Sequence, residues 1–288
     1  MNNLLRINSL IDPFNKKIIV SGDKSISIRC VLLASQAIGV SKIYNLLESE
    51  DVINSLNSIE KLGIKYEKFK NYYKIFGFGI NGYETQKKTK IDAGNSGTLA
   101  RLILGLLINA KNEIKIIGDK SLSKRDFSRV TEPLKKFGVN IYSNKKSLPV
   151  KIIGSEFLRP INYKELLGSA QCKSSVMLAA IKTPGITTIK AKKSRDHTEL
   201  LFKELKIPIK ISKNKKYDLI KIHGPSNFSG FNYNVPGDIS SCAFFLVLAL
   251  LSKKSRIIIK NVNVNISRTG IIKILNRMNA KIKFKNIK

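Results

Sequence analysis

Apolar and polar positions alternate along this chain in four similar blocks of about 70 residues. Each block opens with a turn of small polar residues, and the first glycines of successive turns are 72, 74 and 69 residues apart. The four turns are 22–25, 94–98, 168–171 and 237–241. Self-similarity at a nearly fixed interval indicates repeated copies of one structural unit.

Within each block the pattern predicts two helices separated and followed by strands. A continuous apolar stretch of helical length follows each turn, and a run of β-branched residues comes next. The predicted first helices are 30–37, 99–108, 176–180 and 242–251, and the strands after them are 42–46, 113–117, 187–190 and 256–260. Polar start signals at 49–51, 124–126, 194–196 and 267–269 open a second helix. Further strands are predicted at positions such as 16–20 and 281–284.

The predicted unit is therefore strand, helix, strand, helix and strand, which makes an α/β fold of four repeated units. Unrelated elements whose turns coincide remain the alternative. The longest apolar run, 242–251, is about half of the roughly 20 residues that a membrane-spanning helix needs. We expect it to form a buried helix.

The formal net charge of +32 is the most extreme feature of the composition, and nucleic-acid binding is its usual interpretation. Of the 52 basic residues only ten are Arg, and the Lys residues occur in every segment instead of one stripe with stacking aromatic residues. We therefore expect no nucleic-acid partner. A field of this sign would still attract a small anionic substrate.

Cofactor and targeting motifs are missing from the sequence. Cys30, Cys172 and Cys242 are odd in number and widely spaced, which argues against a zinc site or a disulfide framework. Gly-Asp-Lys-Ser occurs twice, but Asp precedes the Lys where a nucleotide-binding P-loop needs Gly. Residues 1–15 lack the features of a signal peptide. We expect a cytoplasmic protein with no metal, no cofactor and no membrane association.

The repeated turns suit anion binding. A turn of small residues at the head of a helix leaves several backbone N–H groups directed at one spot, although simple helix capping explains any single turn equally well. Guanidinium groups bind phosphate or carboxylate in a bidentate way that Lys cannot copy, and a surface salt bridge is the alternative role. Five of the ten arginines lie in or near the repeated signals: Arg29, Arg101, Arg125, Arg195 and Arg268.

Six segments, taken in order, resemble the motif series of the 3-phosphoshikimate 1-carboxyvinyltransferase (EPSP synthase) family. They are 22–29, 94–98, 124–126, 169–171, 194–199 and 236–241, and the resemblance extends from about residue 16 to 280. It implies an inverted α/β fold of two domains, each built from three units, with the substrates in the cleft between them. It also implies transfer of the enolpyruvyl group of phosphoenolpyruvate to the 5-hydroxyl of shikimate 3-phosphate, with release of phosphate, in the shikimate pathway to aromatic amino acids.

The resemblance assigns substrate contacts position by position. Shikimate 3-phosphate is expected to contact Lys24, Ser25, Arg29, Ser169, Ala170, Gln171 and Arg195. Phosphoenolpyruvate is expected to contact Lys24, Asn95, Gly97, Arg125 and Gln171. Ile28 departs from the family, which commonly has His there, and Asp238 is a further candidate for the cleft.

Length is the main departure from the family. We expect residues 21–235 to form a complete three-unit substrate-binding domain, and residues 1–20 plus 236–288 to form part of a second domain. Two units of that domain are missing, and in the family they bring the residues that transfer protons. No general acid or base is assigned here, and we expect this sequence to be a fragment that is inactive alone and a monomer when full length. A product that binds without turnover, or needs a partner chain, stays open.

Two other functions remain as alternatives. UDP-N-acetylglucosamine enolpyruvyl transferases share the fold, but they typically open with Lys-Asn at the first turn and use a loop Cys. This chain has Asp23-Lys24-Ser25, and its cysteines lie within predicted helices. The other alternative is a non-catalytic module that binds small anions or nucleic acid.

Overall fold

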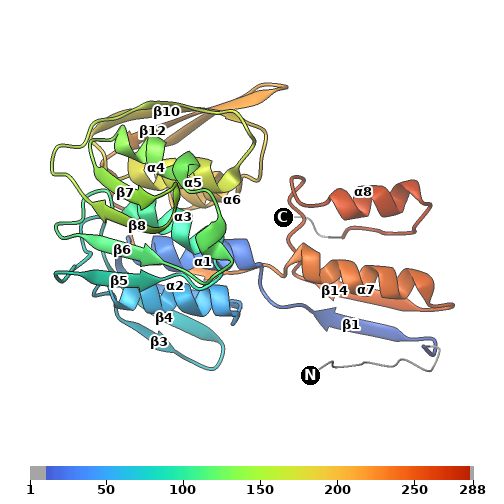
Figure 1. Cartoon of the computed structure of the whole chain (residues 1–288). Coiled ribbons are helices and arrows are strands. Elements are labelled where there is room, and N and C mark those ends of the chain that lie inside the picture. The colour runs from blue at the N-terminus through green and yellow to red at the C-terminus, as the bar shows by residue number, and fades with distance from the viewer. Residues whose placement is uncertain (1–10, 286–288) are drawn as a thin grey trace. The chain divides into compact units, whose positions relative to one another are not determined.

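A computed structural model of the protein describes residues 11–285, which fall into two compact units (Figure 1). The larger unit runs from Lys24 to Val235, and the smaller one contains the described residues up to Asp23 and from Pro236 onward. Each unit has its own hydrophobic core. The chain therefore passes between the units twice, immediately before Lys24 and immediately after Val235.

The larger unit contains three four-stranded sheets of the same topology. In each sheet the first strand runs parallel to the second, and the remaining pairs are antiparallel. In spatial order the strands are β13 (Asn232–Asn234), β2 (Ile38–Tyr44), β4 (Tyr72–Phe78) and β3 (Tyr66–Lys68); β5 (Thr89–Asp92), β6 (Ile114–Ile117), β8 (Ser147–Ile153) and β7 (Asn140–Asn144); and β9 (Asn162–Glu165), β10 (Gly185–Lys192), β12 (Tyr217–Gly224) and β11 (Ile209–Lys213).

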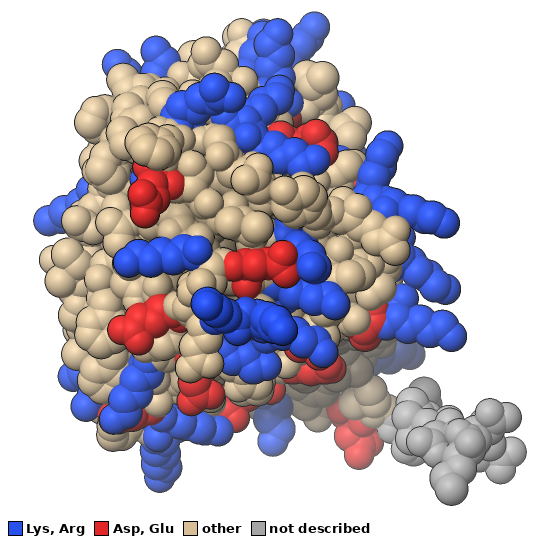
Figure 2. Space-filling view, turned by 60° about the vertical axis from the view of Figure 1, so that its left-hand side comes forward, with Lys and Arg blue, Asp and Glu red and all other residues tan. Residues whose placement is uncertain are grey.

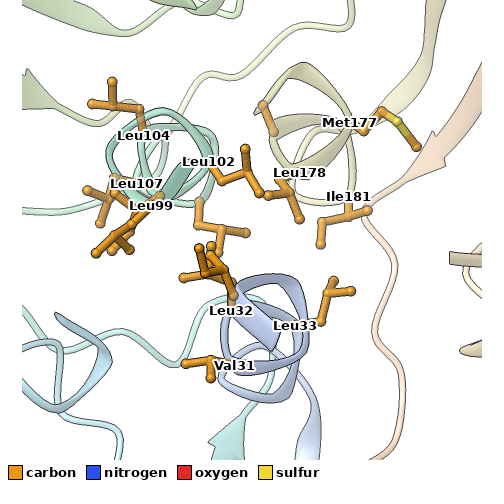
Figure 3. Close-up of a cluster of buried hydrophobic side chains, with 14 of the residues drawn as sticks. Val31, Leu32, Leu33, Leu99, Leu102, Leu104, Leu107, Met177, Leu178 and Ile181 are labelled. Atoms are coloured by element: carbon orange, nitrogen blue, oxygen red, sulfur yellow. The ribbon is translucent and has the colours of Figure 1, made fainter. Parts of the chain in front are cut away.

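Three helices that follow the small-residue turns share the core of the larger unit. They are α1 (Lys24–Ala34), α3 (Gly97–Leu106) and α5 (Ala170–Ala180), and their side chains Leu32, Leu102 and Leu178 converge (Figure 3). The second helices of the repeats are α2 (Glu50–Glu60), α4 (Ser128–Lys135), which follows a short 3₁₀ helix (Leu122–Lys124), and α6 (His197–Glu204). Because three apolar helices surround one another, almost every residue of α1 and α5 is buried.

The leading strand of the first repeat comes from the other end of the larger unit. β13 pairs in parallel with β2, whereas β1 (Asn15–Ile19), which precedes α1 in the sequence, pairs in parallel with β14 (Arg256–Lys260) of the smaller unit. β1 lies in the segment, residues 1–20, that the sequence predicts to belong to the second domain. The pairing of β13 joins the two ends of the larger unit, so its three sheets all have four strands.

The predicted repeated α/β fold is confirmed, with one difference in each repeat of the larger unit. Each of these repeats ends in two antiparallel strands, such as β7 and β8, where the sequence pattern predicted one. The turn between β7 and β8 contains Lys145 and Lys146, both with positive φ. A lysine pair lacks the Asn-Gly or Asp-Gly signal by which such hairpins are recognised, so this turn was missed.

In the smaller unit, α7 (Ile239–Leu251) contradicts the prediction of a buried helix. Ile239 and Cys242 are its buried residues, whereas Phe244 and Leu251 are 78% and 79% exposed. The smaller core, formed by Val20, Ile239, Cys242 and Ile272 of α8 (Gly270–Arg277), covers one side of α7. The prediction failed because an apolar sequence says nothing about how many neighbours a helix has. Within residues 11–285, no helix has both the length and the apolar character needed to cross a membrane.

The strand predicted at 281–284 is also wrong. Residues 281–285 adopt no regular secondary structure. The N–H of Ile282 donates to the carbonyl of Ala280, two residues earlier, and not to a neighbouring strand. The Ile282 side chain packs against the smaller core. The alternation of apolar and polar residues at 281–284 therefore reflects packing of the Ile282 side chain and not a β-strand.

A buried lysine lies where two of the central helices end. Lys182 follows α5 and donates a 2.9 Å hydrogen bond to Oδ1 of Asn109, which follows α3, and a second bond to the carbonyl of Ile80. Its ammonium lies 5.1 Å from the centre of the Tyr83 ring. Burial lowers the pKa of Lys182 from its ordinary 10.5 to about 7, because the charged form loses its hydration.

This shift predicts a pH dependence of stability. The unfolded chain keeps the Lys182 proton up to about pH 10.5, whereas the folded chain releases it near pH 7, so the free energy of unfolding rises between these two values. Lys182→Met should abolish that part of the rise. Urea unfolding of both proteins across this range should give a stability difference that grows in favour of the wild type as pH increases. Parallel profiles would mean that Lys182 keeps an ordinary pKa in the folded chain.

Candidate functional site

The heads of α3 and α5 are joined by side-chain hydrogen bonds. Nε2 of Gln171 donates to Oγ1 of Thr98 at 2.9 Å, and Nη1 of Arg101 donates to Oε1 of Gln171 at 3.0 Å. The resemblance placed Gln171 on both substrates. Its position shows that the two predicted groups of contacts, on α3 and on α5, are neighbours in the larger unit.

A serine in the turn before each of these helices caps the helix, and some backbone N–H groups of the first helical turn remain without an intrahelical acceptor. Oγ of Ser96 accepts from the N–H of Leu99, and Oγ of Ser169 accepts from the N–H of Cys172, both at 3.3 Å. Within the described residues, the N–H groups of Ala170 and Gln171 have no acceptor. Capping and anion binding are therefore compatible here, because a cap satisfies only part of the first turn and the helix dipole favours a negative group there.

A pocket of about 420 Å³ opens at the head of α5. It is lined by Gly168, Ser169, Ala170, Gln171, Ser194 and Arg195. Four of the residues predicted to contact shikimate 3-phosphate therefore surround one hollow, although Arg195 comes from the loop before α6. The volume lies in the ordinary range for small-molecule sites. A wider groove of about 700 Å³ between α4 and β9 is lined by none of the predicted contacts.

The residues predicted on the phosphoenolpyruvate side also lie together. Nη2 of Arg125 donates to Oδ1 of Asn95 at 2.9 Å, and Nδ2 of Asn95 donates to Oδ2 of Asp119 at 2.6 Å. The Leu122 N–H and then the Asn95 amide, both donating to Asp119, lower the pKa of its carboxyl. This chain of bonds sets the orientation of the Arg125 guanidinium.

Gly97 makes room for two guanidinium groups. A Cβ at this position would lie 2.7 Å from Nη1 of Arg101 and 3.0 Å from Nη1 of Arg125. Any other residue would have to push at least one of these arginines aside. The absence of a side chain at Gly97 therefore leaves room for the guanidinium groups of Arg101 and Arg125, in addition to the conformational freedom that glycine gives a turn.

Arg101 joins the parts of the site, although the family resemblance assigns it no substrate contact. Its guanidinium bonds to the carbonyls of Gly97 and Asp126, each at 3.2 Å, and lies 4.7 Å from the centre of the Phe127 ring. Burial, and then repulsion by Arg125, lower its pKa. The signal was present, because Arg101 lies one helical turn after Gly97, but spacing alone does not distinguish a bridging arginine from a ligand contact.

Arg29 is placed differently from the other predicted contacts. It is only 4% exposed, and its three nitrogens donate to Oγ1 of Thr198 (2.8 Å), the carbonyl of Ser25 (2.8 Å) and Oγ of Ser174 (3.1 Å). The structure thus gives Arg29 a position between α1, α5 and α6. Its direct contact with substrate stays a prediction.

Lys24 and Ser25 form the first turn of α1. The Lys24 side chain is half exposed, and its ammonium lies 3.0 Å from Oδ2 of Asp51 in the first turn of α2.

In the smaller unit, Asp238 caps α7 by accepting from the N–H of Ser240 at 2.8 Å, and it also accepts from Nη2 of Arg268 at 3.2 Å. The fourth turn, like the second and third, therefore caps its helix with a side-chain oxygen.

On the face that Figure 2 shows, the basic residues do not gather into one patch. Figure 2 shows Lys and Arg scattered among other residues on the face in view, with Asp and Glu between them. The three cysteines are buried thiols, and among the described residues no cluster of His, Cys, Asp and Glu side chains is suited to hold a metal ion.

The chain matches a known protein family along nearly its whole length. The family profile described as EPSP synthase (3-phosphoshikimate 1-carboxyvinyltransferase) matches residues 9–288. A curated 3-phosphoshikimate 1-carboxyvinyltransferase from Ruthia magnifica subsp. Calyptogena magnifica is 43% identical over 268 residues, which are 93% of this chain and 60% of the relative. The one from Streptococcus mutans serotype c is 38% identical over 266 residues, covering 91% of this chain and 61% of the relative.

A solved structure of EPSP synthase from Acinetobacter baumannii superposes with a TM-score of 0.87 at 34% sequence identity. The match covers 95% of this chain and 61% of that chain. The chain thus spans about three-fifths of the length of the relatives that it matches.

Proposed function

Because the chain belongs to the EPSP synthase family, we propose that it carries the shikimate 3-phosphate contacts, and part of the phosphoenolpyruvate contacts, of a 3-phosphoshikimate 1-carboxyvinyltransferase. The single observation that supports this most is the pocket at the head of α5, which gathers Ser169, Ala170, Gln171 and Arg195. Two backbone N–H groups, a hydroxyl and a guanidinium around one hollow match the needs of a sugar phosphate.

The second substrate is assigned to the head of α3. Arg125, held by Asn95, offers a guanidinium to the carboxylate or phosphate of phosphoenolpyruvate beside Gly97. Lys24 adds a half-exposed ammonium from α1. Gln171, bonded to Thr98, would then touch both substrates, so the hydroxyl to be modified and the enol carbon meet near this amide.

The larger unit acts in this proposal as a complete domain of three repeats, and the smaller unit as the beginning of a second domain. The exposed apolar side chains of α7, such as Phe244 and Leu251, support this assignment. Helices α1, α3 and α5 each follow the same kind of turn and are buried by two neighbours, whereas α7 has such cover on one side. The proton-transferring acid and base are not assigned to any residue here.

Binding and turnover test the proposal separately. Titration calorimetry of this chain should detect shikimate 3-phosphate and give a much weaker signal with unphosphorylated shikimate, because the phosphate supplies the charge that the pocket binds. Phosphate release from the two substrates should require a chain extended to the relatives' full length. Equal binding of shikimate and its phosphate, or binding of neither, would contradict the proposal. The cytoplasmic location and monomeric state belong to the same proposal.

A further inference from the structure

A buried ion pair lies one helical turn behind the pocket. Nζ of Lys173 on α5 is 2.5 Å from Oε1 of Glu199 on α6, and the two side chains are 0% and 4% exposed. Lys173 is four residues after Ser169, and its N–H donates to the Ser169 carbonyl at 3.1 Å. Glu199 is four residues after Arg195. The pair therefore connects the two chain segments that line the pocket.

The neighbours of this pair in sequence are also hydrogen-bonded across the same helices. Oγ of Ser174 and Oγ1 of Thr198 lie 2.7 Å apart, and both accept from the guanidinium of Arg29 on α1. We call Arg29, Lys173, Ser174, Thr198 and Glu199 the polar layer. It links α1, α5 and α6 near their N-terminal ends, and Arg29 is itself one of the residues predicted to contact the sugar phosphate.

Stability alone does not account for charges in this position. Removing two ions from water costs several kcal/mol each, and apolar residues of similar volume are often at least as stable as a buried pair. Burial raises the pKa of Glu199, and the attraction of Lys173 opposes this rise. What a buried pair supplies instead is a fixed separation, because an ammonium and a carboxylate tolerate little displacement in a medium of low polarity.

We propose that Lys173 and Glu199 are positioning residues, which hold the first turns of α5 and α6 at the separation that lets the pocket grip a phosphate. The inference rests on the proposed function, since the ligand is shikimate 3-phosphate. The pair is neutral as a whole, so its effect comes from geometry and not from added positive charge. Its partners across the polar layer, Ser174 and Thr198, extend the same constraint to α1 through Arg29.

Two single variants distinguish geometry from charge. Lys173→Met and Glu199→Gln should both weaken shikimate 3-phosphate binding, each by roughly tenfold, because each breaks the same link within a coupled network. If the pair acted only through its field, Lys173→Met would weaken binding of the anion and Glu199→Gln would strengthen it. Opposite effects, or no effect of either change, would overturn the proposal. Lys173→Arg, which keeps a cation, should lose less affinity than Lys173→Met.

Lys182→Met is the matched control for loss of a buried lysine. It removes a lysine that is also buried (5% exposed) at the other ends of the central helices, where Lys182 contacts Asn109 and not the pocket. It should leave shikimate 3-phosphate affinity unchanged. If it weakened binding as much as Lys173→Met, general loosening of the fold would explain the result and positioning would be refuted.

The full chain is used throughout, and folding is checked by thermal unfolding before each titration. If a single variant fails to fold, the double variant Lys173→Met with Glu199→Leu removes both buried charges and keeps the volume filled. It should fold and still bind shikimate 3-phosphate more weakly than the wild type, and wild-type affinity would overturn the proposal. Absence of binding by the wild type would refute the proposed function itself, and this inference with it, whereas strong binding by every variant would refute positioning alone.

Discussion

Arg125→Ala should weaken phosphoenolpyruvate binding by roughly 10- to 100-fold, whereas Lys221→Ala should leave it almost unchanged. A hydrogen bond to a charged group contributes about 1.5 to 3 kcal/mol, and a guanidinium can make two such bonds to one carboxylate or phosphate. Arg125 is held for this contact by Asn95, which is held in turn by Asp119. Lys221 is an exposed residue of β12, and its replacement by Ala removes the same single positive charge as Arg125→Ala.

The measurement is calorimetric titration of phosphoenolpyruvate in the presence of saturating shikimate 3-phosphate, on a chain of the relatives' full length. The Lys221 control removes the contribution of the overall positive field, which both variants reduce equally. Similar, small losses in the two variants would contradict the assignment of Arg125. They would indicate that phosphoenolpyruvate responds only to the net charge of the protein.

Gly105→Ala should lower the free energy of unfolding by about 2 kcal/mol, as expected for overpacking of a core. A Cβ at Gly105 of α3 would lie 2.1 Å from the carbonyl oxygen of Ser175 on α5, which is backbone and cannot rotate away. The two helices would have to separate. Since the heads of the same helices carry Thr98 and Gln171, the variant should also lose shikimate 3-phosphate affinity.

Urea unfolding followed by circular dichroism measures this effect, with Gly270→Ala as the control. A Cβ at Gly270, in the first turn of α8, would meet nothing within 4 Å, so that variant should unfold at nearly the wild-type urea concentration. Equal midpoints for the two variants would mean that α3 and α5 are not packed backbone to backbone at Gly105.

The repeat interval made most of the fold predictable. Once each small-residue turn was recognised, the strand predicted at 256–260 corresponded to β14, and the apolar stretch 99–108 fell on α3. What a repeated pattern cannot supply is the identity of neighbours. The hairpin turn at Lys145 and Lys146 has no residue that favours positive φ, and the exposure of α7 depends on packing that its own residues do not encode.

The candidate site was predictable where a residue acts through its own turn. Ser169, Ala170 and Gln171 line the pocket as a local sequence suggests, because the head of one helix gathers them. Arg29 and Arg101 show the limit of such reasoning. Both lie one helical turn after a small-residue signal, yet one is buried between helices and the other bridges two turns, and these roles are set by residues far away in sequence, such as Thr198 and Gln171.

Backbone amide chemical shifts would show whether the head of α5 holds the phosphate of shikimate 3-phosphate, as proposed. Isotope-labelled protein would be titrated with the ligand and, separately, with unphosphorylated shikimate. The largest shifts specific to the phosphate are expected at Ala170, Gln171 and Arg195, which line the pocket. Shifts spread evenly over exposed lysine segments, with these three amides unmoved, would contradict it.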